Sequence, residues 1–220
     1  MKLLEHILDL LFPPKCPFCG RVREQGGICP QCEKALPWTE ENNACWKLSG
    51  GLRCAAPMWY EDLAREGILR FKFRGAPASA EPLGELLARC AAEHFSGEFD
   101  TVTWVPVSKK RLRKRGYDQA ELLARAACRL WGTEPVDLLD KTVDNPAQSG
   151  ITDDAARRAN VLGVYALHPG VDVAGKRVLL VDDICTTGAT LAECARVLRD
   201  AGAESVVCAA VAKTRKKFKK

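Results

Sequence analysis

Apolar residues along this chain occur either in short continuous runs or at helical spacing, and the two patterns alternate. Continuous runs predict strands, whereas apolar residues that recur every three to four positions predict amphipathic helices. Strands are predicted at residues 101–107, 135–139, 161–167, 178–181 and 205–212, and helices at residues 82–95, 118–131 and 189–202. Residues 56–75 are partly helical in pattern, and residues 3–11 fit one face of a short helix. This alternation indicates an α/β fold: a mainly parallel twisted sheet with helices on both faces.

Ligands of such sheets bind at the carboxyl ends of strands, and residues 178–190, VLLVDDICTTGAT, reach such an end. The apolar run predicts a strand buried on both faces, which we expect Asp182 and Asp183 to terminate. The following turn contains Thr186, Thr187, Gly188, Ala189 and Thr190. Unpaired N–H groups and the helix dipole favour an anion where the next helix begins. Threonine hydroxyls donate to phosphate and carboxylates accept from sugar hydroxyls, so the stretch predicts a ribose 5-phosphate site.

The alternative is an ordinary strand-to-helix turn in which Asp and Thr side chains only cap the helix. One cap needs one such residue, whereas residues 182–190 cluster five polar side chains (two Asp and three Thr) and a glycine. The order DD-x-x-TTG-x-T also resembles the 5-phosphoribosyl-1-pyrophosphate (PRPP) loop of type I phosphoribosyltransferases. That resemblance implies that Asp182 and Asp183 take the ribose hydroxyls and that the threonine-rich turn takes the 5-phosphate. It favours the binding interpretation over simple capping.

The formal net charge of +5 is concentrated in two basic clusters, KKRLRKR at residues 109–115 and KTRKKFKK at residues 213–220. This distribution indicates local anion sites rather than a uniformly basic domain. The first cluster directly follows the strand predicted at residues 101–107. We therefore expect Ser108, Lys109 and Arg111, with Arg115 as a weaker candidate, to face the pyrophosphate of PRPP. The alternative is a solvated positive turn, and the second cluster fits a solvated terminus.

Two CxxC turns near the amino terminus predict a metal site. Cys16, Cys19, Cys29 and Cys32 supply four thiolates, which complete a closed tetrahedral and therefore structural Zn²⁺ site. A redox CxxC is expected beside a βαβ unit, but this segment is rich in Pro and Gly. Cys45 and Cys54 are either free thiols or an irregular second site. The other cysteines, Cys185 in the turn included, are interpreted as small buried residues.

Three segments in this order resemble the ComF family: VPVSKKRLRKRGYDQAELLA (residues 105–124), TVDNPAQSGITDDAARRANVLGVY (residues 142–165) and the PRPP-like loop. Members join an amino-terminal zinc module to a type I phosphoribosyltransferase-like domain and are linked to natural competence and DNA uptake. The RGxxQ element of the family matches at Arg115, Gly116 and Gln119, with Tyr117 and Asp118 where Phe and Asn are common. Gln148, Arg157 and Asn160 match a further pattern, and the resemblance implies that they belong to a mobile loop over PRPP.

The resemblance implies a phosphoribosyltransferase-like protein that binds PRPP with Mg²⁺ and transfers phosphoribose to an unknown acceptor. Asp182 and Asp183 would orient the sugar, and Lys109, Arg111 and the metal would offset the charge of the leaving pyrophosphate. The alternatives are a PRPP sensor without turnover or a single-stranded-DNA-binding competence factor, and a zinc-mediated adaptor is a third interpretation. Possible partners are single-stranded DNA and competence proteins such as a DNA-uptake helicase.

The chain lacks other active-site patterns: it contains no GxxxxGK[ST] or GxGxxG, and its three histidines are scattered. No apolar run approaches the ~20 residues that a membrane-spanning helix needs, so we expect a soluble, cytoplasmic protein. The expected organisation is an amino-terminal helix and zinc module at residues 1–50, a phosphoribosyltransferase-like domain at 51–212 and a basic tail at 213–220.

Overall fold

The computed structural model describes residues 13–23, 26–73, 76–145 and 159–215. The helix expected at residues 3–11, and Gln148 and Arg157 of the expected mobile loop, lie outside the described residues.

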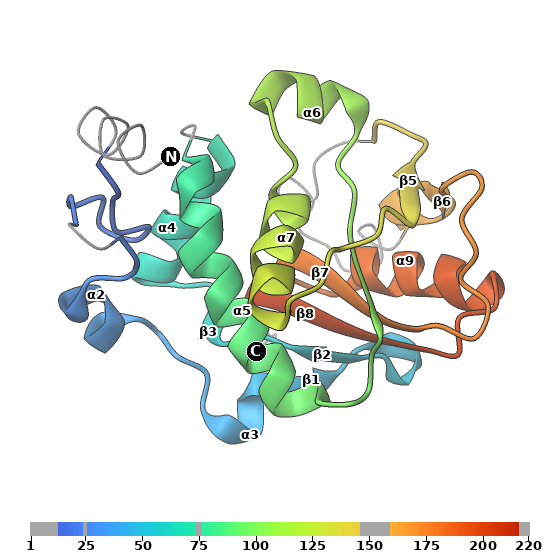
Figure 1. The fold of residues 1–220 in the computed structure, drawn as a ribbon, viewed down its shortest axis with the longest axis horizontal. Helices are drawn as coiled ribbons and strands as arrows, with labels where there is room; N and C mark the ends of the chain where they lie inside the picture. Colours follow the sequence, from blue (N-terminus) through green and yellow to red (C-terminus); the bar gives the residue numbers. More distant parts are fainter. Residues whose placement is uncertain (1–12, 24–25, 74–75, 146–158, 216–220) are drawn as a thin grey trace, which may run out of the picture.

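A six-stranded sheet forms the centre of the molecule (Figure 1). Its strands are β1 (Cys45–Lys47), β2 (Arg53–Ala55), β3 (Met58–Trp59), β4 (Thr101–Trp104), β7 (Arg177–Cys185) and β8 (Ser205–Lys213). They follow the order β1-β2-β8-β7-β4, and β3 also pairs with β8. Every pairing is parallel except β1 with β2, which is antiparallel. The predicted mainly parallel sheet is therefore confirmed.

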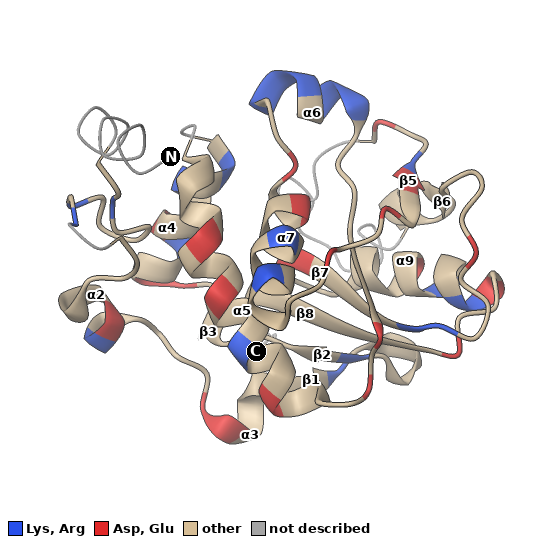
Figure 2. Ribbon diagram, viewed as in Figure 1, with Lys and Arg blue, Asp and Glu red and all other residues tan. Residues whose placement is uncertain are grey.

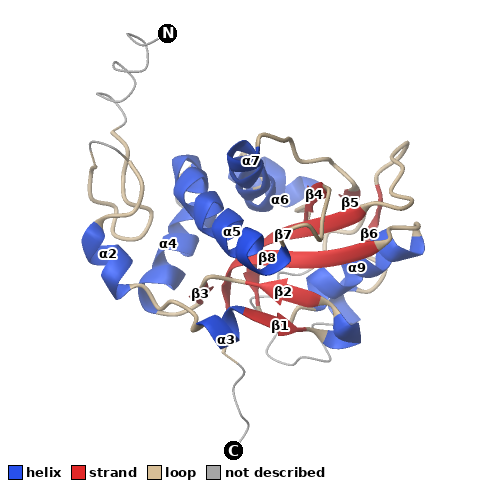
Figure 3. Cartoon of the chain, turned by 60° about the horizontal axis from the view of Figure 1, so that its bottom comes forward, coloured by secondary structure: helices blue, strands red, loops and turns tan. Residues whose placement is uncertain are grey.

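Helices cover both faces of this sheet (Figure 3). On one face lie α5 (Ala80–Phe95) and α7 (Gln119–Trp131), and on the other lies α9 (Ala189–Asp200). One core cluster joins Leu83, Leu87 and Leu123 to Leu179 and Val181 of β7, whereas the second joins Leu191 and Leu198 to Val178 and Leu180. Successive β7 side chains thus alternate between the two cores, as a strand requires.

The close packing of α5 on α7 depends on one glycine. A Cβ built on Gly84 of α5 would lie only 2.4 Å from Ala126 Cβ of α7. A larger residue would force the two helices apart, because a packed interior has no room for the added carbon.

Two predicted strands differ from the structure. Residues 135–139 and 161–167 were expected in the main sheet, but β5 (Leu139–Lys141) and β6 (Tyr165–Leu167) instead form a separate antiparallel pair. Val161 lies in a helical turn before β6. Apolar patterning predicted extended structure near both positions but carries no information on which partner a strand pairs with.

The amino-terminal segment and the larger unit share one core. Helix α2 (Pro30–Ala35) begins within the second CxxC, with Cys29 as its N-cap and Cys32 inside it. Helix α3 (Glu41–Ala44) leads into β1, and α4 (Asp62–Phe73) follows β3. Short 3₁₀ turns lie at Ser49–Gly51 and Pro77–Ser79. The first core cluster extends from Phe18 to Ile68 and Phe71 of α4.

Lys213 does not belong to a solvated tail, contrary to expectation. It is the last residue of β8 and is buried, with Nζ 2.9 Å from the carbonyl oxygen of Asn43 and 3.8 Å from the Trp46 ring centroid. The Lys213 ammonium also lies 4.7 Å from the Trp59 ring centroid, so it makes cation–π contacts with two tryptophans. The following Arg215 forms an ion pair with Glu61.

Within the described part of the chain, every helix is too short or too polar to cross a bilayer.

Candidate functional site

Strand β7 carries the acid pair inside the sheet, not beyond its end. We expected the strand to stop at Asp182, but the pairing with β8 continues through Ile184 and Cys185. The carboxylates therefore follow the side-chain alternation of the strand. Asp182 lies on the α9 side, where it interacts with Tyr165 and Cys194, and Asp183 lies on the side of α4 and α7.

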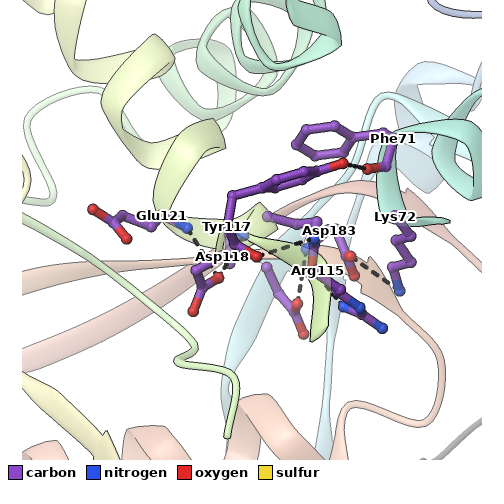
Figure 4. Close-up of polar contacts among 10 residues, drawn as sticks. Phe71, Lys72, Arg115, Tyr117, Asp118, Glu121 and Asp183 are labelled. Carbon is purple, nitrogen blue, oxygen red and sulfur yellow. Dashed lines mark hydrogen bonds and ion pairs between the residues drawn. The ribbon is translucent and has the colours of Figure 1, made fainter. Parts of the chain in front are cut away.

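Asp183 is paired with a lysine that sequence reasoning did not assign to the site. Lys72 Nζ, at the end of α4, lies 3.0 Å from Asp183 Oδ2, and the two side chains are 19% and 11% exposed (Figure 4). Burial, and then the charge of Asp183, raise the pKa of Asp182 well above its ordinary value, while Lys72 opposes the rise. The pair thus combines repelling carboxylates with one close cation.

The turn after β7 presents the amino terminus of α9, as predicted. Gly188 precedes the helix with φ +77°, and a Cβ there would lie 2.5 Å from Leu48 Cδ2, so both the backbone and the packing require glycine. The first turn of α9 contains no acidic residue. A narrow hollow over this terminus is lined by Asp182 and residues 184–191. Its backbone N–H groups and threonine hydroxyls suit an anion.

A larger cavity of about 220 Å³ adjoins the other side of the same turn. Its lining comprises Ser49, Val161, Leu162, Thr187, Gly188, Ala189, Ala192, Glu193 and Arg196. The Glu193 carboxylate already has partners within the protein: it accepts from Gly163 N–H at 2.8 Å and forms an ion pair with Arg196 at 2.8 Å. The cavity therefore offers mainly apolar surface beside the phosphate turn.

The basic cluster after β4 is a helix, α6 (Lys109–Arg115), which the apolar pattern of the sequence did not predict. Ser108 is its N-cap, accepting from Arg111 N–H at 3.3 Å, and Gly116 ends it with φ +84°. Both signals were visible in the sequence, since serine caps and terminal glycines are typical helix boundaries. Figure 2 shows α6 almost entirely basic above α7.

The candidate pyrophosphate residues of α6 contact the segment that leaves β5. Ser108 Oγ donates to Asp144 Oδ1, and Arg111 Nη2 donates to the Asn145 carbonyl at 2.7 Å. Asn145 in turn donates to the carbonyl of Asn160, the described residue of the expected mobile loop. Lys109 is exposed. The structure thus joins Ser108 and Arg111 to both flanks of residues 146–158.

Arg115, Tyr117 and Asp118 connect α6 to α7. Arg115 lies 4.9 Å over the Phe73 ring, and its charge interacts with Asp183. The buried Asp118 caps α7 and accepts from Val107 N–H at 2.8 Å, and burial raises its pKa to about 6. Asp118 therefore fixes the loop between β4 and α6.

A second lysine that the sequence did not reveal lies on the opposite side of the acid pair. Lys141 Nζ, on β5, is 3.4 Å from Tyr165 Oη and 5.2 Å from its ring centroid. Burial lowers its pKa to about 8, and the charge of Arg111 acts in the same direction. Residues such as Lys72 and Lys141 give no local sequence signal, because only the fold brings them near Asp182 and Asp183.

The four predicted zinc ligands lie together. The Sγ atoms of Cys16, Cys19, Cys29 and Cys32 are all within 4.8 Å of one another. Zn–S bonds of ~2.3 Å in a tetrahedron place sulfurs about 3.8 Å apart, and the Cys19–Cys29 separation is 3.7 Å. The Cys32 N–H lowers the pKa of Cys29 to about 7, which favours the thiolate. The cluster fits a closed structural Zn²⁺ site.

Cys45 and Cys54 do not join this cluster. They lie on neighbouring strands, but the register pairs Cys45 with Ala55 and Cys54 with Trp46. Both are free thiols, and the cluster above is the one metal-ligating group of three or more residues within the described ranges.

Two family models match parts of this chain. Residues 112–220 match the phosphoribosyl transferase domain and residues 7–66 match the double zinc ribbon domain. The chain is 30% identical over 202 residues to competence protein ComFC of Streptococcus pneumoniae, which covers 87% of this chain and 84% of that protein. The chain belongs to the ComFC family. The resemblance noted in the sequence is thereby confirmed.

Two further relatives extend the ComFC match. Competence protein ComFC of Bacillus subtilis is 25% identical over 191 residues, covering 85% of this chain and 72% of its own. DNA utilization protein YhgH of Escherichia coli K12 is 28% identical over 208 residues, covering 87% and 86%. The family therefore includes proteins named for competence and for DNA utilization.

Proposed function

We propose that this ComFC-family chain binds PRPP with Mg²⁺ and transfers its phosphoribosyl group to an acceptor. The observation that carries the proposal is the junction of β7 and α9, where the acid pair lies a few residues before a helix N-terminus that suits an anion. The match to a phosphoribosyl transferase domain over residues 112–220 supports the same interpretation.

Each part of PRPP has complementary groups at this junction. The N–H groups and hydroxyls of residues 186–190 suit the 5-phosphate, and the carboxylates of Asp182 and Asp183 suit the ribose hydroxyls. Ser108, Lys109 and Arg111, at the carboxyl end of the neighbouring β4, suit the pyrophosphate. Lys141 and Lys72 add positive charge near the carboxylates.

The proposed reaction is a displacement at C1 of the ribose. The acceptor nucleophile forms a bond to C1 while the bond from C1 to the pyrophosphate oxygen breaks, and pyrophosphate leaves with the electron pair. Such a step depends on positioning and on neutralising the leaving group rather than on a covalent protein nucleophile. When bound, Mg²⁺ supplies part of that neutralisation.

A release assay distinguishes a transferase from a sensor. The protein is incubated with Mg²⁺–PRPP and separate pools of bases, amines and nucleic-acid fragments, and released pyrophosphate is measured. We expect release to require one acceptor class and to be lost in the Asp182→Asn, Asp183→Asn variant. Calorimetric binding of PRPP without release from any pool would support the sensor alternative. Neither binding nor release would contradict both.

A second candidate function is binding of single-stranded DNA on α6. This helix contains six basic residues and no acidic one, and its Lys109, Lys110, Arg113 and Lys114 are exposed. Leu112 is exposed as well. An exposed basic helix attracts nucleic-acid phosphates, and the names of the relatives favour this partner.

Replacing Lys110, Arg113 and Lys114 by Ala should weaken binding of a labelled thymidine oligonucleotide, measured by fluorescence anisotropy. Each lost phosphate contact should reduce the slope of log affinity against log salt by about 0.7, so three lower it by about 2. The control replaces Lys34, Lys47 and Arg199, three exposed basic residues on other elements. Equal loss in both variants, or binding by neither wild type nor variant, would remove α6 as a DNA surface.

A further inference from the structure

The ion pair between Lys72 and Asp183 places two charges where they are largely shielded from water, which costs desolvation free energy. Both side chains are largely withdrawn from water, and the N–O distance is 3.0 Å. The free energy lost when a lysine and a carboxylate leave water is recovered by their attraction only when the geometry of the pair is well fixed. The lysine side chain also gives up much rotational freedom to hold one position. Something must therefore fix the end of α4 beside β7.

Contacts on two sides fix this helix. On the side of the segment that joins α6 to α7, Tyr117 Oη donates to the Phe71 carbonyl (Figure 4). Arg115, at the end of α6, lies over the Phe73 ring. Toward the zinc module, Arg70 Nη1 donates to the Phe18 carbonyl at 2.7 Å. Gly67 allows that contact, because a Cβ there would lie 2.5 Å from the Phe18 ring. These contacts lie on both sides of Lys72 in the sequence and hold its backbone in place.

The groups facing the acid pair come from every neighbouring element. Asp182 and Asp183 are adjacent on β7, Lys72 comes from α4, and Arg115 comes from the end of α6. The Tyr60 hydroxyl also lies within electrostatic range of Lys72 and Asp183. Burial raises the pKa of Tyr60, so this hydroxyl stays neutral. On the far side, Asp118 and Lys141 interact with Asp182. Among these cations, Lys72 is the one in direct contact with a carboxylate of the pair.

We propose that Lys72 is a positioning residue that opposes protonation of the Asp182–Asp183 pair, so that the carboxylates remain available to accept from the ribose of PRPP. A buried carboxyl next to another carboxylate takes up a proton more readily when no cation is close, because like charges disfavour ionisation of the second group. A protonated carboxyl is a poorer acceptor for sugar hydroxyls. The inference rests on the proposed function and adds one residue to its site: Lys72 of α4, which influences the protonation of the two carboxyl groups.

The test compares Lys72→Met, Lys72→Gln and Lys72→Arg with wild type by calorimetry of Mg²⁺–PRPP across pH ~6 to ~8.5. Without the cation the pair takes up a proton at higher pH, so Met and Gln variants should bind at least about tenfold more weakly near pH 6.5. The deficit should shrink as pH rises and the pair ionises. Arg should restore the wild-type profile, and Lys47→Met, at an exposed site, should not alter it.

A second readout separates this inference from the proposed function. ¹³C NMR of the aspartate carboxyls follows the titration of the pair in the ligand-free protein, and its midpoint should move to higher pH in the Met and Gln variants. An unchanged midpoint, or a pH-independent binding loss, overturns the role of Lys72 even when PRPP binds. Absence of PRPP binding in the wild type rejects the proposed function, while the carboxyl titration still decides whether Lys72 sets the charge.

Discussion

Replacing Asp182 and Asp183 together by Asn should abolish the rise in melting temperature that Mg²⁺–PRPP gives the wild type. A ligand at about 100 times its Kd stabilises a protein by about 2.7 kcal/mol. For a chain of this size, that corresponds to a rise of about 5–10 °C. Asn keeps the size of Asp but removes the charge, so the ribose loses its carboxylate acceptors and Lys72 loses its partner. The measurement is a thermal melt with and without the ligand.

The matched control is Asp100→Asn. Asp100 pairs with Arg177 at the opposite end of β7, and the Nε–Oδ2 distance is 3.1 Å. This substitution also removes an ion pair from the same strand, but it lies far from the anion-binding turn. We expect a lower melting temperature with an undiminished ligand-induced rise. A rise that survives in the double Asn variant would contradict the assignment of the acid pair.

Much of this site was predictable because its signals are local. The apolar run, the glycine and the amphipathic helix all lie within residues 178–202, and together they predict β7 and α9. The error was the strand end. Sequence reasoning treats a carboxylate as a strand terminator, but pairing with β8 continues the ladder past Asp183. Pairing partners decide where a strand stops, and they are distant in the sequence.

The basic cluster at residues 109–115 also has local signals, but its apolar pattern did not predict the helix α6. The apolar pattern predicts no helix over residues 109–115, because Leu112 is the one apolar residue of the segment, although Ser108 and Gly116 mark both helix ends. Lys72 is a different case. It lies in an ordinary amphipathic helix, and its partner comes from β7 only after the sheet forms. No local pattern reveals such a residue, whereas the four cysteines were found because metal-ligand spacing is itself local.

Removing Zn²⁺ should destabilise more than the amino-terminal module. The four-cysteine cluster holds Phe18, which is fully buried in the same core cluster as Ile68 and Phe71 of α4. Structural zinc sites in small modules contribute on the order of 10 kcal/mol to folding, although only the part linked to this contact reaches α4. Loss of the Phe18 packing alone costs about 3–5 kcal/mol. At about 2–4 °C per kcal/mol, the melting temperature should fall by roughly 6–20 °C.

The variant for this test is Cys16→Ser with Cys19→Ser, compared with Cys90→Ala with Cys128→Ala, two buried thiols in α5 and α7 outside the zinc cluster. Metal analysis should find one zinc per chain in the wild type and the control, and none in the Ser variant. Because Arg70 and Gly67 of α4 contact Phe18, loosening the module should also release Lys72 from Asp183. The Ser variant should then show the weaker PRPP binding near neutral pH expected for Lys72→Met. Unchanged melting after zinc loss would show that α4 keeps its place without the zinc module, through its contacts with Tyr117 and Arg115.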